Sequence, residues 1–251
     1  MTTAIFAPGG YRYIPGVFQY SGGVAAERGH EIVRVRFHRP VPLAAGFGRI
    51  AEIIRAAGRP LTAFCACELR SPAPFTEDGF RAFNEVYVGT LRQWGVVQET
   101  NKGTTNPVAR SNVCPALEPP AKPSFYAFCY TIASQAAPTF AVAGSGEAPE
   151  GKPSYRDHIV APGDTSADGM RQKARFVLGE MERRLAMLGF AWRDTTDTQV
   201  YSVHDIHPFL ADEIIRRGAM ASGLTWHFCR PPVVGLEYEM DCRAVAKETV
   251  V

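Results

Sequence analysis

The sequence has no long apolar run, which excludes the usual kind of membrane-spanning helix. Such a helix needs about 20 consecutive apolar residues, and no segment of the 251 residues approaches that length. The first ten residues, MTTAIFAPGG, also lack the basic and apolar regions of a secretory signal peptide. We therefore expect a cytoplasmic protein with no membrane contact.

Basic stripes, cysteine pairs and nucleotide-binding motifs are missing as well. The net charge is only +2 and no run of Lys or Arg stands out, so no nucleic-acid partner is expected. The six cysteines form no CxxC pair, so their spacing predicts neither a zinc cluster nor a disulfide framework. No P-loop, GxGxxG motif or Ser-His-Asp set is present. His204 and His207 lack a third ligand nearby in the sequence, which favours a strand-to-helix connection over a metal site.

The residues that are present predict a globular protein with alternating strands and helices. The composition is 46% hydrophobic and 21% charged, which is enough for a sizeable core. Periodicity and turn residues define the elements. The predicted helices are 43–54, 80–91, 174–188 and 209–215. The predicted strands are 11–21, 31–37, 62–69, 111–116, 125–132, 139–143, 157–160, 199–203, 223–228 and 235–244.

The order of these elements, β-β-α-β-α-β-β, occurs twice. The period is about 125 residues, which is too long for a solenoid repeat and indicates duplication of a whole domain. We therefore predict an α+β protein with two tandem domains, residues 1–135 and 136–251.

Several short motifs in this order resemble the RidA/YjgF/UK114 superfamily. Tyr20 to Gly23 (YSGG) is similar to a strand-ending VSGQ, and Phe83 to Tyr87 (FNEVY) is similar to a helical VNxxY. Pro107 to Ser111 (PVARS) is similar to the PARS signature with one residue inserted after Pro. In the second half, CRPPVVGLEYEMDCRAV is similar to the end of the family pattern, which contains VEIE.

The resemblance implies two RidA-like (chorismate-mutase-like) domains, each a mixed β-sheet backed by two α-helices. Members of the superfamily form trimers with ligand sites between neighbouring subunits. A chain with two such domains is therefore expected to form a homotrimer that contains six of them.

The resemblance also implies that Arg110, the arginine of the PARS signature, binds a carboxylate. A guanidinium has a planar fork of donors that matches a carboxylate in a bidentate manner. The second half has Gly223 at the equivalent position, so it is not expected to have a site of the same kind. The alternative for Arg110 is a surface arginine at the end of a strand.

Glu239 matches the second glutamate of VEIE, which in the superfamily holds the attacking water. The first half has no acid at the equivalent position, so Arg110 and Glu239 lie in different halves. Two explanations stay open: a composite site between the halves, or a site at Arg110 whose water is activated by a neighbouring Tyr, Cys or His. A third interpretation of Glu239 is a strand-edge carboxylate paired with Arg243.

The resemblance implies five further substrate-binding positions. We expect the Tyr11 ring over the ligand and a backbone N–H of Gly22 near it. Asn84 and Tyr87 lie on a helix that faces the site, although Tyr87 also fits a core aromatic at helical spacing. The hydroxyl of Ser111 is positioned to donate a hydrogen bond.

The function implied by the resemblance is hydrolytic deamination of a small enamine or imine acid. Among enlarged relatives, the chain resembles the 2-aminomuconate deaminases of aromatic-amine degradation. Neither metal nor organic cofactor is expected, because an imine carbon is already electrophilic. A dicarboxylate substrate would need a second cation, for which Arg12 and Arg230 are candidates. The alternatives are a general deaminase of 2-aminoacrylate-type imines and a non-catalytic trimer that binds a carboxylate ligand.

Overall fold

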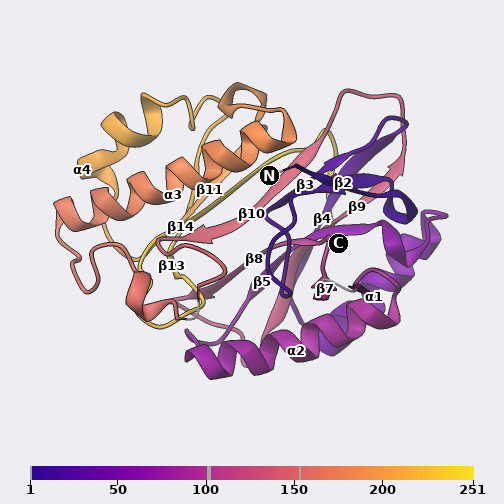
Figure 1. Cartoon of the computed structure of the whole chain (residues 1–251), viewed down its shortest axis with the longest axis horizontal. Coiled ribbons are helices and arrows are strands. Elements are labelled where there is room, and N and C mark those ends of the chain that lie inside the picture. Colours follow the sequence, from indigo (N-terminus) through magenta and orange to yellow (C-terminus); the bar gives the residue numbers. More distant parts are fainter. Residues whose placement is uncertain (1, 101–102, 153) are drawn as a thin grey trace.

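The computed structural model describes residues 2–100, 103–152 and 154–251, and places two β-sheets face to face between two helical layers (Figure 1). A core cluster that includes Val24, Ala141 and Cys65 joins the two sheets. The helices are α1 (Leu43–Ala56), α2 (Glu77–Gln93), α3 (Ala167–Leu188) and α4 (His207–Phe209), which continues as a π-helix, Leu210–Ile215. Short 3-10 helices cover Ala7–Gly9, Leu61–Ala63, Arg156–His158 and Trp192–Asp194. The predicted α+β class is confirmed.

The first sheet has seven strands, and α3 and α4 pack on its outer face. Its order is β1 (Ala4–Phe6), β2 (Tyr11–Tyr13), β3 (Gly23–Ala26), β10 (Phe140–Gly146), β14 (Glu239–Ala244), β11 (Asp197–Tyr201), β12 (Thr225–His227). Only the β11–β12 pair of this sheet is parallel.

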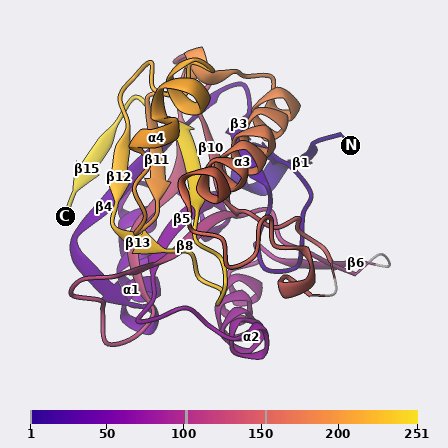
Figure 2. The same ribbon diagram turned by 90° about the vertical axis from the view of Figure 1, so that its left-hand side faces the viewer.

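The second sheet has six strands, and α1 and α2 pack on its outer face. Its order is β13 (Cys229–Arg230), β8 (Ala109–Pro115), β5 (Phe64–Arg70), β9 (Ser124–Ala133), β4 (His30–Pro42), β15 (Glu248–Val250). β6 (Gln98–Thr100) and β7 (Gly103–Thr105) pair separately. Figure 2 shows α2 and α3 on opposite sides of the paired sheets.

Each sheet contains strands from both sides of residue 135. The N-terminal strands β1, β2 and β3 extend the sheet of the second half, since β3 pairs with β10. In return, β13 and β15 from the second half form the two edges of the other sheet. The division into 1–135 and 136–251 stays a prediction, and the two halves exchange strands across it.

The three longest helices form where apolar periodicity predicts them, and side chains cap the start of α2 and α3. The predicted helices over 43–54, 80–91 and 174–188 lie within α1, α2 and α3. Ser166 accepts a hydrogen bond from the Gly169 N–H at the start of α3, and Gly189 (φ 87°) ends it in the left-handed region. Thr76 caps α2 in the same way as Ser166 caps α3.

The predicted strand over 157–160 is wrong, because this segment contains the 3-10 helix Arg156–His158 instead. The carbonyls of Val160 and Ala161 accept hydrogen bonds from Lys173 Nζ, each at 2.8 Å. Ala161 also has a positive φ of 46°, which turns the chain away from an extended path. These carbonyls therefore do not pair with a neighbouring strand.

Lys173 also forms a fully buried ion pair that ties the end of β10 to the segment leading into β14. Its Nζ lies 3.4 Å from Glu147 Oε1, and both side chains are 0% exposed. The Glu147 carboxylate accepts the backbone N–H groups of Glu237 at 2.6 Å and Tyr238 at 3.1 Å. The pair thus fixes the chain immediately before Glu239.

We predict that Lys173→Met lowers the free energy of unfolding by about 3–5 kcal/mol, because it removes the cation that is paired with the buried Glu147 carboxylate. Urea unfolding measures the change. Arg216→Met is the control, since it breaks an ion pair with Asp212 whose side chains are 76% and 48% exposed, and exposed pairs contribute little. Equal losses in the two variants would contradict the assignment.

Candidate functional site

A small cavity lies where β8 of one sheet meets β10 and β14 of the other. Arg110 and Asn112 line it from β8, Gly144 lines it from β10, and Glu239 lines it from β14. The loop after β10 contributes Glu150 and Tyr155 to the wall. The cavity therefore brings together Arg110 and Glu239, which lie in different halves of the sequence, within one chain.

Arg110 is a buried cation without an acidic partner. The residue is only 3% exposed, and its Nη1 donates a 2.6 Å hydrogen bond to Asn84 Oδ1. Within the described part of the chain the guanidinium forms no salt bridge. Four rings surround its central carbon at 4.9–5.7 Å: Tyr87, Tyr20, Phe80 and Phe83. A buried guanidinium that has no acidic partner favours the binding of an anionic ligand.

Glu239 is a buried carboxyl that lines the cavity, and the residue is 4% exposed. Burial raises the pKa of its carboxyl well above the usual range, and the nearby Asp241 raises it further. Arg110 lowers this pKa but does not outweigh the other two causes. The carboxyl is therefore protonated well above the pH at which an exposed glutamate ionises. It does not pair with Arg243, which binds Asp197 at 2.6 Å.

Gly144 leaves the space that the Glu239 carboxyl occupies. A Cβ at this position would overlap Glu239 Oε1 and would lie 3.2 Å from the Cα of Ser111 on the opposite sheet. Arg184 holds this part of β10, because its Nη1 donates to the carbonyls of Ala143 at 2.9 Å and Gly144 at 3.3 Å. Only glycine fits here without moving Glu239.

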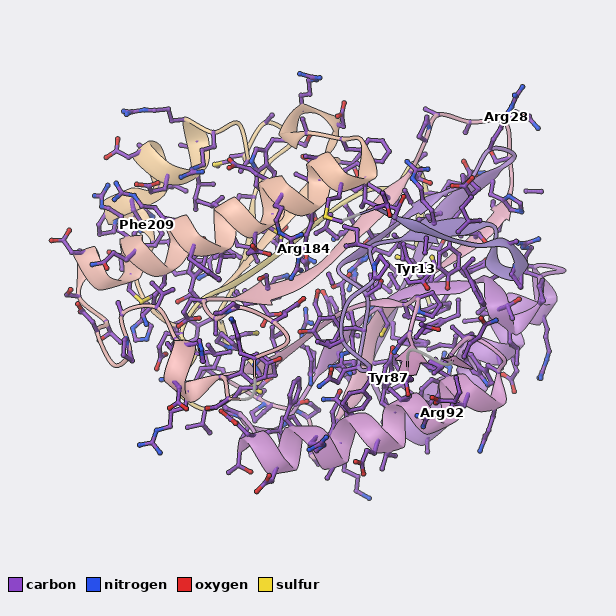
Figure 3. The ribbon with its side chains drawn as sticks, viewed as in Figure 1. Tyr13, Arg28, Tyr87, Arg92, Arg184 and Phe209 are labelled. Atoms are coloured by element: carbon purple, nitrogen blue, oxygen red, sulfur yellow. The ribbon has the colours of Figure 1, made fainter. Side chains whose placement is uncertain are left out.

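Arg184 also fixes the loop wall of the cavity. Its Nη2 donates a 2.8 Å hydrogen bond to Glu150, and its side chain is 0% exposed. Figure 3 shows Arg184 below α3 and Tyr87 above α2, so both side chains lie on the inward sides of their helices. The two helical layers thus support the cavity from opposite sides.

Asn84 and Tyr87, both predicted to bind substrate, lie behind Arg110. Asn84 Nδ2 donates to the Phe80 carbonyl at 2.7 Å while its Oδ1 accepts from Arg110, which orients the amide. The Tyr87 hydroxyl lies 3.3 Å from Cys67 Sγ, and its ring faces the guanidinium. These two side chains position Arg110 and do not line the cavity.

Tyr11, Gly22 and Ser111 lie outside the residues that line this cavity. The Tyr11 hydroxyl donates to the Phe64 carbonyl at 3.1 Å inside the core, and the Gly22 N–H is bound to the Ile14 carbonyl at 3.0 Å. Ser111 Oγ donates to Asp241 at 2.5 Å between the sheets. Their contact with substrate stays a prediction, and their positions outside this cavity do not support it.

The other charged candidates are engaged elsewhere. Arg12 binds Glu27 at 3.3 Å and the Leu188 carbonyl at 2.8 Å, and Arg230 binds Glu237 at 2.7 Å. His204 lies 2.8 Å from the same Glu237 carboxylate. Among residues 2–100, 103–152 and 154–251, no three His, Cys, Asp or Glu side chains are grouped to hold a metal ion. In the same ranges, no helix has the length and apolar character needed to cross a membrane.

Sequence reasoning missed Asn112, Gly144, Glu150 and Tyr155. Asn112 had a usable signal, since it follows Arg110 by two residues where the predicted strand 111–116 begins, and side chains two apart on a strand share a face. Glu150 and Tyr155 lie in a Pro- and Gly-rich loop whose path no local pattern predicts.

One protein family and one relative match this chain over nearly its full length. The family described as 2-aminomuconate deaminase CnbZ matches residues 3–249. A 2-amino-5-chloromuconate deaminase from Comamonas testosteroni is 54% identical over 249 residues, which cover 98% of each chain. Among solved structures, the E. coli YjgF gene product is 16% identical, with a TM-score of 0.32 over 43% of this chain and 81% of its own. A chorismatase is 11% identical, with a TM-score of 0.39 over 97% and 79%. The sequence match establishes that the chain belongs to the 2-aminomuconate deaminase CnbZ family.

Proposed function

We propose that the protein is a hydrolytic deaminase of the 2-aminomuconate type, active in the breakdown of aromatic compounds. It converts the enamine acid and water to the 2-oxo or 2-hydroxy acid and ammonia. The observation that supports this most is the cavity that combines a buried, unpaired guanidinium with a carboxyl of raised pKa. The 54% identity to a 2-amino-5-chloromuconate deaminase supports the substrate class.

In this proposal Arg110 binds the carboxylate beside the carbon that carries nitrogen. The bidentate contact orients this carbon in the cavity. The enamine accepts a proton on a double-bond carbon that does not carry nitrogen and becomes an iminium. Water then adds to the nitrogen-bearing carbon. The carbinolamine nitrogen then takes a proton from the Glu239 carboxyl and leaves as ammonia with the electron pair of the C–N bond. The hydroxyl group returns its proton to Glu239 and becomes the 2-oxo group.

Glu239 transfers the protons in these steps. Its protonated carboxyl donates to the substrate, and the carboxylate that results accepts a proton from the attacking water. The water therefore supplies the oxygen of the product, and the carboxyl returns to its starting state. General acid–base assistance of this kind contributes about 10²–10⁴-fold. The iminium carbon is itself electrophilic, so these residues are sufficient for the steps described.

The test is ammonia release by the purified protein, without added metal or cofactor, from freshly generated 2-aminomuconate. The expected result is one ammonia per substrate, with a higher kcat/KM than for 2-aminoacrylate-type imines. A higher kcat/KM for the small imines would favour the general imine deaminase. Binding of 2-aminomuconate without ammonia release would favour a non-catalytic carboxylate receptor.

We also propose a cytoplasmic homotrimer with six RidA-like domains, supported by the superfamily resemblance of the sequence motifs. Arg110 and Glu239 line one cavity of a single chain, so neither must come from a neighbouring subunit. Light scattering coupled to size-exclusion chromatography measures the assembly, and a mass other than three chains would contradict the trimer.

Gly144→Ala is predicted to lower kcat by about 100-fold, because its Cβ would displace the Glu239 carboxyl and small displacements of reacting groups are costly. Gly179→Ala is the matched control. Gly179 lies within α3 with open space around a Cβ, and alanine there favours the helix. Steady-state ammonia release by both variants measures the effect. A Gly144→Ala enzyme with the kcat of the wild type would argue against Glu239 as the proton donor.

A further inference from the structure

Asn112 is a buried donor that no protein acceptor satisfies. The residue is 3% exposed, and its Oδ1 accepts a 2.9 Å hydrogen bond from Ser71 Oγ. Its Nδ2 has no hydrogen-bond partner in the part of the chain that the structure describes. Buried polar groups in proteins are almost always hydrogen-bonded, so an unpartnered donor calls for an explanation. Because Asn112 lines the cavity, a ligand can supply the acceptor.

The position of Asn112 relates this donor to Arg110. Both residues lie on β8, two positions apart, and the pairing of β8 with β5 runs without interruption from Ala109 to Val113. Side chains two apart on a regular strand point to the same face. The two donors therefore enter the same cavity from one strand.

The charges of the cavity indicate what these donors bind. Arg110 forms no salt bridge among the described residues, and the lining carboxylate of Glu150 is paired with Arg184 at 2.8 Å. Burial raises the pKa of Glu239, which favours its neutral form over that of a counterion. Ser71 occupies the acceptor end of the Asn112 amide, so the donor end is left for a ligand. A ligand group with two acceptor oxygens and a negative charge complements both residues.

We propose that Asn112 is a specificity-determining residue that donates a hydrogen bond from Nδ2 to the same substrate carboxylate that Arg110 holds. The inference rests on the proposed function in one respect, since it takes Arg110 as the carboxylate site. The Asn112 amide adds a neutral, directional hydrogen bond to the charged contact made by Arg110. The side chain therefore discriminates a planar carboxylate from other anions and fixes the rotation of the substrate.

Equilibrium binding of two unreactive probes tests this proposal. Muconate is a six-carbon chain with a carboxylate at each end of a four-carbon diene, and sorbate has a methyl group in place of one carboxylate. Asn112→Asp keeps the side-chain shape and the acceptor for Ser71, but places an oxygen where the donor was. We expect the Kd of both probes to rise by at least about tenfold, and by less in Asn112→Ala, which only removes the donor.

Asn106→Asp is the matched control for replacing a buried asparagine. Asn106 is also 3% exposed, but its Nδ2 already donates to the carbonyls of Phe18 and Gln19, and it does not line the cavity. Near-ultraviolet circular dichroism shows which variants are folded at the temperature of the assay. Folded Asn106→Asp protein is expected to bind both probes as the wild type does.

Several results would overturn the inference. One is unchanged binding of the probes in both Asn112 variants. Another is weaker binding of muconate alone, which would assign the contact to the distal carboxylate. The third is no binding of either probe by the wild type. The ammonia assay separates this from the proposed function. A wild-type protein that binds both probes through Asn112 but releases no ammonia would disprove the deaminase and leave the carboxylate site in place.

Discussion

Arg110→Ala is expected to lower kcat/KM for 2-aminomuconate by roughly 30-fold to several thousand-fold. Truncating one partner of a buried charged pair costs about 2–5 kcal/mol, and each 1.36 kcal/mol is about tenfold in rate. The loss follows from the site, because Arg110 is the buried cation of the cavity and its only acceptor among the described residues is neutral Asn84. Steady-state kinetics of ammonia release measure the effect.

Arg110→Lys is expected to recover little of this loss. A lysine ammonium is a compact charge that cannot form the planar, bidentate contact, and it does not reproduce the stacking of a guanidinium on the four surrounding rings. Arg12→Ala is the control, since Arg12 binds Glu27 and Leu188 outside the cavity. Equal rates for wild type and Arg110→Ala would remove Arg110 from the mechanism.

Glu239→Gln is expected to lower kcat by about 10²–10⁴-fold with little change in KM. Glutamine keeps the shape of a protonated carboxyl and fits beside Gly144, but it does not transfer a proton. The variant should therefore bind 2-aminomuconate and fail to release ammonia at the normal rate. A large rise in KM with an unchanged kcat would instead make Glu239 a binding residue.

The pH dependence gives a second measure of the role of Glu239. Burial raises its pKa, so the proton-donating form is present below the folded pKa and is lost as the pH rises through it. The alkaline limb of kcat should therefore lie well above the ordinary range of a glutamate, and it should disappear in Glu239→Gln.

Thermal unfolding should show that Glu239→Gln, which lowers kcat, makes the protein more stable at neutral pH. An unfolded glutamate ionises near pH 4.3, while the folded carboxyl stays protonated to higher pH. The contribution of protonated Glu239 to the free energy of unfolding is thus fully present below the pKa of the unfolded state. It is lost as the pH rises towards the pKa of the folded state. At neutral pH Glu239→Gln should have a higher Tm than the wild type, and a lower Tm would contradict the raised pKa.

Local patterns predicted the helices and the two main candidates, because each rests on neighbours in the sequence. The apolar stripe of α3 and its caps Ser166 and Gly189 lie within one short segment. Arg110 and Glu239 each matched a short motif of the superfamily. Their meeting in one cavity could not be read from periodicity, since it depends on how β8 packs against β10 and β14.

The strand exchange between the halves also lay beyond local patterns. β3 pairs with β10 across more than a hundred residues, and nothing in either segment specifies this partner. The same limit explains Gly22, whose N–H is used by the turn back to Ile14, and Tyr11, whose hydroxyl is used inside the core. Motif positions located these residues in the chain but not their hydrogen-bond partners.

The structure of Glu239→Gln bound to 2-aminomuconate tests the central claim most directly. Slow turnover in this variant should retain the substrate long enough for crystals or for rapid freezing. The account predicts one carboxylate on Arg110 and the nitrogen-bearing carbon facing residue 239, in the cavity between the two sheets. A substrate bound in any other part of the molecule, or in this cavity with its carboxylate away from Arg110, would contradict it.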